Sequence, residues 1–141
     1  MIVAENDLAA DRSERVPSLR EHPHGLRTIT DLVNGWDCLE VEGEILAIDI
    51  PSLAAAANHA FVKYPVRLIV DLTGVIVCHE EGIRWLREIA DRIDRGNGEL
   101  LVGVVPGGPL HQLLEGEDIA TIEPTQLALL RDNDQISKGA E

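Results

Sequence analysis

The chain has 141 residues, of which 45% are hydrophobic and only 3% aromatic, so we expect one domain with a core of aliphatic side chains. Its 25 acidic residues outnumber 12 basic ones, which gives a formal net charge of −13. A surface this acidic repels nucleic-acid phosphates and anionic membrane surfaces, so we expect neither as a partner.

The cysteines and the apolar runs set further bounds. Cys38 and Cys78 form no Cys-x-x-Cys pair, so nothing indicates a disulfide framework or a zinc site. The first ten residues lack the basic start and long apolar run of a signal peptide. The apolar runs also fall short of the roughly 18 residues of a membrane-spanning helix. We therefore expect a cytoplasmic protein without a cofactor.

The first part of the chain predicts an arm followed by a hairpin. Residues 1–25 mix charges with prolines and hold no apolar period, which is typical of a flexible arm. Residues 26–33 are rich in β-branched side chains and end at Asn34-Gly35, a strong hairpin signal. Residues 36–42 should then return as an antiparallel strand.

Helices and buried strands follow in alternation. Pro51 and the alanine run after it predict a helix over residues 50–63. Residues 66–72 (VRLIVDL) predict a strand buried on both faces. Residues 81–95 are the clearest helix, because their apolar residues form one stripe and Gly96-Asn97-Gly98 follows them.

The last third repeats the alternation. It predicts a strand at 99–105, a helix at 109–115, a strand at 119–122 and a helix at 124–131, and a frayed tail over 132–141. The order β-β-α-β-α-β-α-β-α predicts an α/β fold, a mixed β-sheet flanked by helices, in a domain spanning 26–131.

One segment resembles a known family. Residues 71–83 read DLTGVIVCHEEGI, which is similar, register for register, to the stretch D-L-[ST]-x-V-x-x-x-D-S-S-G-[LI] of the STAS domains of anti-sigma-factor antagonists. Upstream, Gly43-Glu44 resembles the family's G-E-L-D, and Pro51 fits its helix start. The resemblance covers residues 26–130 in pattern and implies a STAS-like fold.

The resemblance also implies a function. Such domains dock onto a protein partner, often an anti-sigma factor with kinase activity, and so release a sigma factor. Their switch is the first serine of D-S-S-G, whose phosphorylation disrupts docking.

The chain departs from the family at this switch. His79 replaces the aspartate, Glu80 the phosphoacceptor serine and Glu81 the second serine, while Gly82 remains. Leu46 stands where the family has the aspartate of G-E-L-D. Because Glu80 has no hydroxyl, the usual serine switch is not expected to operate.

Glu80 has two interpretations. A carboxylate in the first turn of a helix meets unpaired N–H groups and gains about 0.3–1 kcal/mol, so Glu80 could be a weaker, permanent copy of a phosphoserine. It could equally be an ordinary first-turn residue beside an exposed cap, His79. Thr73 or Ser52 could carry a displaced phosphorylation site.

The predicted partner-binding surface joins the two segments that match the family. Trp85 has two interpretations, a packing residue at the helix edge or a partly exposed anchor of this surface. The surface comprises Leu46, Ala47, Ile48, Asp49, His79, Glu80, Glu81, Gly82, Ile83, Arg84 and Trp85. A metal or acid–base cluster at 78–81 is disfavoured because consecutive residues entering a helix point in different directions. A tight turn is favoured over a phosphate-binding loop at 106–109 because the P-loop lysine and spacing are absent.

The sequence thus predicts a non-enzymatic regulatory module. Its expected partner is a protein, an anti-sigma factor or a kinase-type regulator, and a homodimer is possible. The alternative is a ligand-sensing or scaffold STAS module that binds a small molecule or a second copy of itself. No nucleophile and base stand together in a pattern that supports an enzyme.

Overall fold

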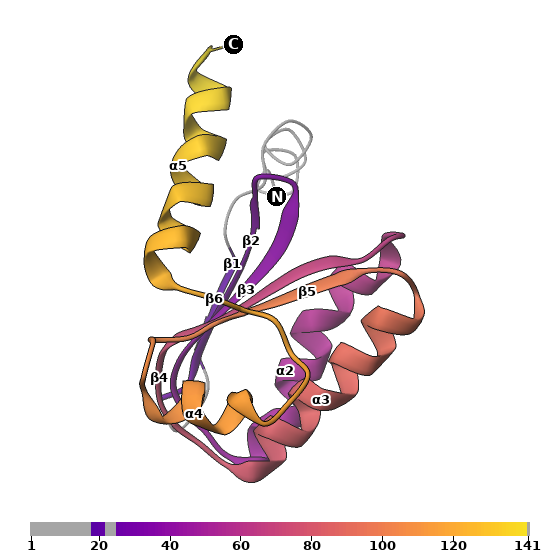
Figure 1. Ribbon diagram of the computed structural model, residues 1–141, viewed down its shortest axis with the longest axis vertical. Coiled ribbons are helices and arrows are strands. Elements are labelled where there is room, and N and C mark those ends of the chain that lie inside the picture. The colour runs from indigo at the N-terminus through magenta and orange to yellow at the C-terminus, as the bar shows by residue number, and fades with distance from the viewer. Residues whose placement is uncertain (1–17, 22–24, 141) are drawn as a thin grey trace, which may run out of the picture.

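A computed structural model describes residues 18–21 and 25–140 (Figure 1). The strands are β1 (Ser18–Glu21), β2 (Arg27–Val33), β3 (Trp36–Ile45), β4 (Arg67–Cys78), β5 (Glu99–Gly103) and β6 (Thr121–Ile122). The α-helices are α2 (Ile50–Ala57), α3 (Glu80–Arg95), α4 (Pro109–Glu115) and α5 (Pro124–Ala140), with short 3-10 helices η1 (Ala47–Asp49) and η2 (Asn58–Val62).

The six described strands form one mixed sheet in the order β1-β2-β3-β4-β5-β6. β1, β2 and β3 pair antiparallel, whereas β3 to β6 pair parallel. The predicted hairpin is present, since Asn34 and Gly35 have φ angles of 51° and 85°, as a type I′ turn requires. The predicted mixed sheet with flanking helices is confirmed.

Helices cover both faces of the sheet, and each face has its own core (Figure 1). The larger core lies between the sheet and α2, α3 and α4. The helices contribute Leu53, Leu86 and Leu114, which pack on inward residues of β3, β4 and β5. Leu127 of α5 packs on the other face with Trp36 and Ile69. β4 is therefore buried on both sides over its first half, as its apolar run predicts.

The structure adds one strand that was not predicted and extends β3, β4 and α5 beyond their predicted limits. Ser18–Glu21, inside the predicted arm, is β1, because its backbone pairs with the outer edge of β2 without needing an apolar pattern. Residues 1–17 and 22–24 of the arm lie outside the described residues. β4 continues to Cys78 because β3 also runs on, to Ile45, and pairs with it. α5 reaches Ala140, through most of the predicted tail, since backbone hydrogen bonds continue a helix without an apolar stripe.

Bulges in β4 explain the Asp-Leu-Thr motif. Glu40 pairs with Asp71 and Glu42 with Gly74, so β4 gains one residue relative to β3. Thr73 lies in this bulge, and its N–H and its Oγ1 donate to Asp71 Oδ1 at 3.0 and 2.7 Å. The carboxylate thus satisfies a backbone group within the irregular part of the ladder.

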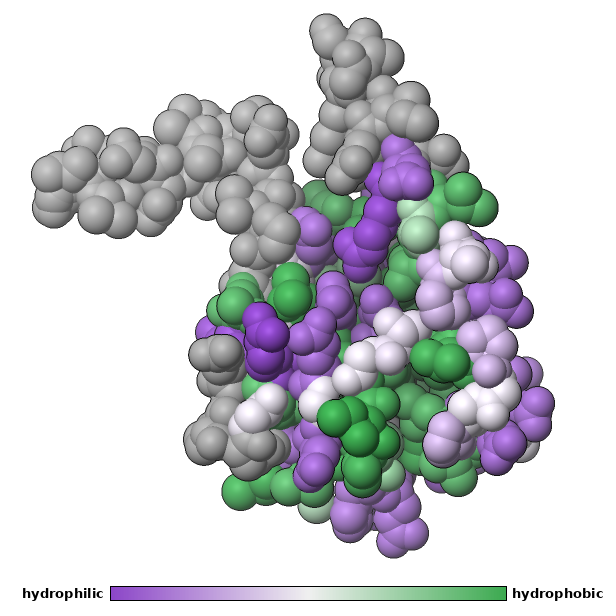
Figure 2. Space-filling model, turned by 90° about the vertical axis from the view of Figure 1, so that its left-hand side faces the viewer, coloured by the Kyte–Doolittle hydropathy of each residue, from purple (hydrophilic) through white to green (hydrophobic). Residues whose placement is uncertain are grey.

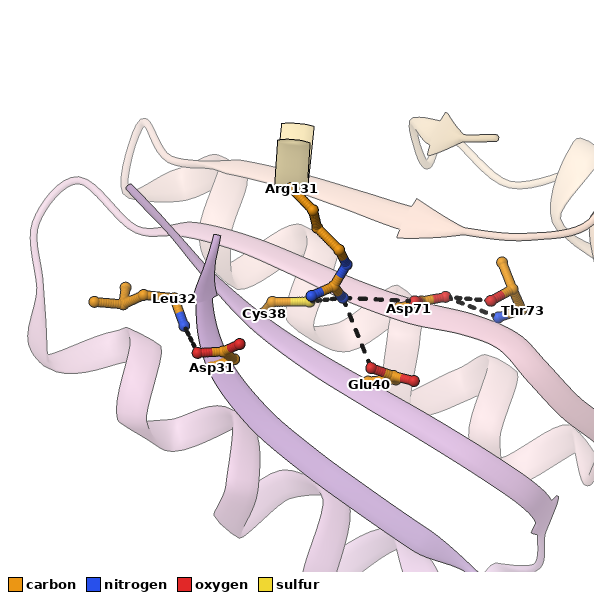
Figure 3. A network of polar contacts seen from close by, with 7 residues as sticks. All are labelled: Asp31, Leu32, Cys38, Glu40, Asp71, Thr73 and Arg131. Atoms are coloured by element: carbon orange, nitrogen blue, oxygen red, sulfur yellow. Dashed lines mark hydrogen bonds and ion pairs between the residues drawn. The ribbon is translucent and has the colours of Figure 1, made fainter. Parts of the chain in front are cut away.

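The same carboxylate belongs to a polar network under α5 (Figure 3). Arg131 Nη2 lies 3.9 Å from Asp71 Oδ2, 3.7 Å from Glu40 Oε1 and 3.6 Å from Cys38 Sγ. Burial and the charge of Asp71 raise the pKa of Glu40, and Arg131 opposes them. A raised folded-state pKa means that the stability contributed by protonated Glu40 is present at low pH and is lost as the pH rises above the ordinary value of 4.5.

We predict that Glu40→Gln raises the free energy of unfolding at about pH 7 and leaves it unchanged at about pH 3.5, where the native carboxyl is already protonated. Arg131→Met should lower it by about 1–3 kcal/mol at about pH 7, because Asp71 and Glu40 lose their cation. Urea denaturation followed by circular dichroism measures both. Equal effects of Glu40→Gln at the two pH values would contradict the network.

Candidate functional site

The junction of β4 and α3 is the centre of the candidate surface. His79 is the N-cap of α3, and its Nδ1 accepts a hydrogen bond from the Glu81 N–H at 3.0 Å. Glu80 is the first residue of the helix and is exposed. Its carboxylate therefore lies at the positive end of the helix dipole, as the sequence predicts. Glu81 is half-buried and pairs with Arg84 at 3.0 Å.

The second predicted segment lies directly beside this junction. The His79 N–H donates to Ile45 O at 2.8 Å, which joins the end of β3 to the start of α3. η1 follows at once and contacts α3. Asp49 Oδ2 accepts from the Leu46 N–H at 2.8 Å and so fixes the turn between β3 and η1. The structure thus brings together the two segments that the sequence assigned to one surface.

Part of the predicted set is exposed. Ile48 exposes 76% of its surface, which is unusual for a large apolar side chain beside an ordered turn. Ala47, His79, Glu80 and Arg84 are exposed as well, and Leu46 is half-buried. An apolar side chain flanked by charged ones can be covered by a protein partner.

Four of the predicted partner-binding residues are instead buried. Trp85 is only 5% exposed and packs in the larger core, so it is not a partly exposed anchor, and its Nε1 has no partner among the described residues. Ile83 and Gly82 face the same core side of α3. Asp49 is 3% exposed, because its carboxylate serves the turn. The sequence correctly predicts an apolar stripe on α3 that includes Ile83 and Leu86, and it places Trp85 beside that stripe. In the structure the larger core contains Trp85 as well as the stripe.

The cysteine closest to the junction is not an activated thiol. Burial raises the pKa of Cys78 to about 11. Burial also raises the pKa of Cys38 to about 12, although Arg131 opposes it. A thiol is a nucleophile only as the thiolate, so neither pKa favours catalysis at neutral pH. Within the described ranges, no group of three or more His, Cys, Asp or Glu residues could hold a metal ion.

Sequence reasoning missed an apolar groove next to this junction, which we call the β4–α4 groove. It encloses about 460 Å³ between the end of β4, the loop after β5 and α4. Val75, Ile76 and Val77 line one side, and Val105, Leu110 and Leu113 line the other. The run Val75-Ile76-Val77 could have indicated this groove, because three consecutive apolar residues are unusual in the exposed loop that the sequence predicts after residue 72.

The structure is similar to two solved proteins of known class. The anti-sigma factor antagonist SpoIIAA in its unphosphorylated form matches with a TM-score of 0.56 and 10% identity, over 89% of this chain and 98% of that chain. An anti-sigma factor antagonist from Mycobacterium paratuberculosis matches with a TM-score of 0.59 and 19% identity, over 79% and 99%. The chain has the fold of the anti-sigma factor antagonists. The predicted STAS-like fold is thereby confirmed.

The antagonist fold is shown by structure alone. No protein-family model and no curated protein matches the sequence. Among the described residues, no helix has both the length and the apolar character needed to cross a bilayer.

The glycine shared with the family motif has a steric role. A Cβ at Gly82 would lie 2.7 Å from Cys78 Sγ and 3.2 Å from Ile45 Cγ2. The first turn of α3 therefore lies so close to β3 and β4 that a Cβ at this position would force the Cys78 side chain to move. This contact positions Glu80 relative to η1 within the antagonist fold.

We predict that Gly82→Ala lowers the free energy of unfolding by about 1–2 kcal/mol, since overpacking outweighs the gain in helix propensity. Cys78→Ala should remove the nearer clash, so Gly82→Ala should cost less in that background, by about 1 kcal/mol. Gly116→Ala, at a glycine with no atom within 4 Å of its Cβ position, is the matched control and should be near neutral. Additive effects of the two changes in urea denaturation would contradict the contact.

Proposed function

We propose that the chain is a non-enzymatic regulatory module that binds a protein partner, an anti-sigma factor or a kinase-type regulator, through the surface formed by η1 and the start of α3. The observation that carries the proposal is the exposed Glu80 carboxylate at the first position of α3, directly beside the exposed Ile48 turn. This is the position at which the resembling family carries its phosphoacceptor serine.

The same position supports loss of the serine switch. Glu80 offers no hydroxyl, and neither do His79 and Glu81. A carboxylate brings less charge than the roughly −1.5 to −2 of a phosphoserine, and no phosphate can be added to it or removed from it. Docking then has no phosphorylation-dependent off state at this position, and binding is constitutive or directed to a partner that does not depend on phosphorylation.

Two hydroxyls elsewhere differ in their availability to a kinase. Thr73 Oγ1 donates to Asp71 at 2.7 Å inside the bulge of β4 and is half-buried, so phosphorylation would break the Asp71 contacts. Ser52 is exposed in the first turn of α2, directly after η1. Of the two, Ser52 is the more accessible site for a displaced switch.

The docking surface is tested by charge reversal. Purified kinase-type anti-sigma factors of the same organism are immobilised, and binding of the chain is followed by biolayer interferometry. We expect Glu80→Lys to weaken binding at least about tenfold and Glu80→Ser to retain it, because reversed charge repels where a neutral hydroxyl does not. Asp94→Lys, the same change near the other end of α3, is the control and should bind like the unmodified chain.

Equal losses from Asp94→Lys and Glu80→Lys would show a general charge effect and overturn the assignment of the surface. Absence of binding by the unmodified chain to any of these factors would overturn the partner class.

The lost switch is tested by phosphosite mapping. After incubation with each kinase-type factor and ATP, we expect no phosphate on residues 79–81, and peptide mass spectrometry measures this directly. Phosphate at Ser52 that abolishes binding would show that control had moved to α2. Phosphohistidine at His79 would contradict the proposal that this junction is free of phosphorylation.

A further inference from the structure

We propose that the β4–α4 groove receives an extended, apolar segment of the protein partner that also carries lysine or arginine. This inference rests on the proposed function for the partner's identity, but it adds a second contact surface and states its chemistry. Four observations support it: an open strand edge, exposed apolar side chains, the acidic charge of the chain with Glu80 beside the groove, and continuity with the proposed docking surface.

The open edge comes from unequal strand lengths. β5 ends at Gly103, which pairs with Asp71, whereas β4 continues to Cys78. The stretch from Leu72 to Cys78 therefore has no β5 partner on that side. Such an edge is a template for an added strand, in which the backbone supplies affinity and alternate side chains enter the adjoining pocket.

The side chains around this edge are apolar and exposed. Ile76 exposes 77% of its surface, Leu113 54%, and Val77 and Val105 49% each. They come from three separate segments of the chain and line the same groove, so they form one apolar surface. The side of the molecule on which Figure 1 shows β4 and α4 faces the viewer in Figure 2, where hydrophobic residues gather in the lower part. Contiguous apolar surface of this kind marks binding sites.

The charge beside the groove comes from Glu80. Among the described residues no charged side chain lines the groove itself, and exposed Glu80 lines a neighbouring hollow that shares Cys78 and Leu113 with it. The arginines of that hollow are already paired: Arg84 with Glu81 at 3.0 Å, and Arg87 with Glu117 at 2.8 Å. A segment with lysine or arginine complements Glu80 and the net charge of −13, whereas a second copy of the chain is repelled by that charge.

The groove is continuous with the proposed docking surface. A neighbouring hollow of about 350 Å³ is lined by Glu80, Ile83 and Arg84. It shares Cys78 and Leu113 with the β4–α4 groove. One partner can therefore contact the start of α3 and place an extended segment along β4 at the same time.

The test uses the ¹⁵N-labelled full chain and the synthetic peptide acetyl-KLKLKLK-amide, whose leucines share one face when it is extended. In about 150 mM NaCl, where long-range attraction is screened, we expect amide shifts at residues 73–78, 105 and 110–113. Acetyl-KAKAKAK-amide, with the same charge, and acetyl-ELELELE-amide, with the same leucines, should each bind at least about tenfold more weakly.

Variants locate the contact. Leu113→Glu and, independently, Ile76→Glu should each weaken peptide binding at least about tenfold. Leu129→Glu changes a 61% exposed leucine of α5 and should have no effect. A thermal melt of each variant shows that it is folded, and either groove variant alone suffices for the test.

Several results would overturn the proposal. They are shifts confined to other surfaces, equal binding of the leucine and alanine peptides, or a dimer in sedimentation that Ile76→Glu dissociates. A co-purifying small molecule whose removal alone shifts the groove amides would assign the groove to a ligand instead. Because the peptide assay needs no anti-sigma factor, its failure is distinct from failure of the proposed function.

Discussion

The parallel pairing of β3 with β4 holds the candidate surface together. Its last pair joins Ile45 to Cys78, and the ladder continues as one further hydrogen bond from the His79 N–H to Ile45 O. Both strands end at this point, and β3 is followed by η1 and β4 by α3. If the pairing ended earlier, Ile48 and Glu80 would have no fixed relation.

The same pairing brings the first turn of α3 close to the ends of β3 and β4, behind the candidate surface. Gly82 brings the first turn of α3 against Cys78 and Ile45, at a distance where a Cβ would force the Cys78 side chain to move. The exposed side of that turn is thereby fixed by contacts on its buried side. Glu80 and Arg84 can vary in chemistry without disturbing the packing, because their side chains are exposed. This separation allows the antagonist fold to form with different residues on the exposed side of the first turn of α3.

The irregular half of β4 links the polar network to the groove. Its bulges need a local partner for the Thr73 N–H, and Asp71 supplies it on the face covered by α5. Arg131 then offsets the charge of Asp71 and Glu40 (Figure 3). Beyond the bulge, β4 runs past the end of β5 and leaves the edge that forms the β4–α4 groove. The strand is thus structural over its first half and available for binding over its second.

The sequence by itself determined the alternation of strands and helices, the Asn34-Gly35 hairpin and the place of Glu80 at the start of a helix, because apolar periodicity, turn chemistry and capping act over a few neighbouring residues. It also drew the two halves of the candidate surface together through the family motif. Only the tertiary structure decided that Trp85 is buried, that Ser18–Glu21 is a strand and that β4 runs to Cys78. Each of these depends on a partner far away in the sequence. The groove has the same origin, because its lining comes from β4, the loop after β5 and α4, and no local pattern records which strand ends first.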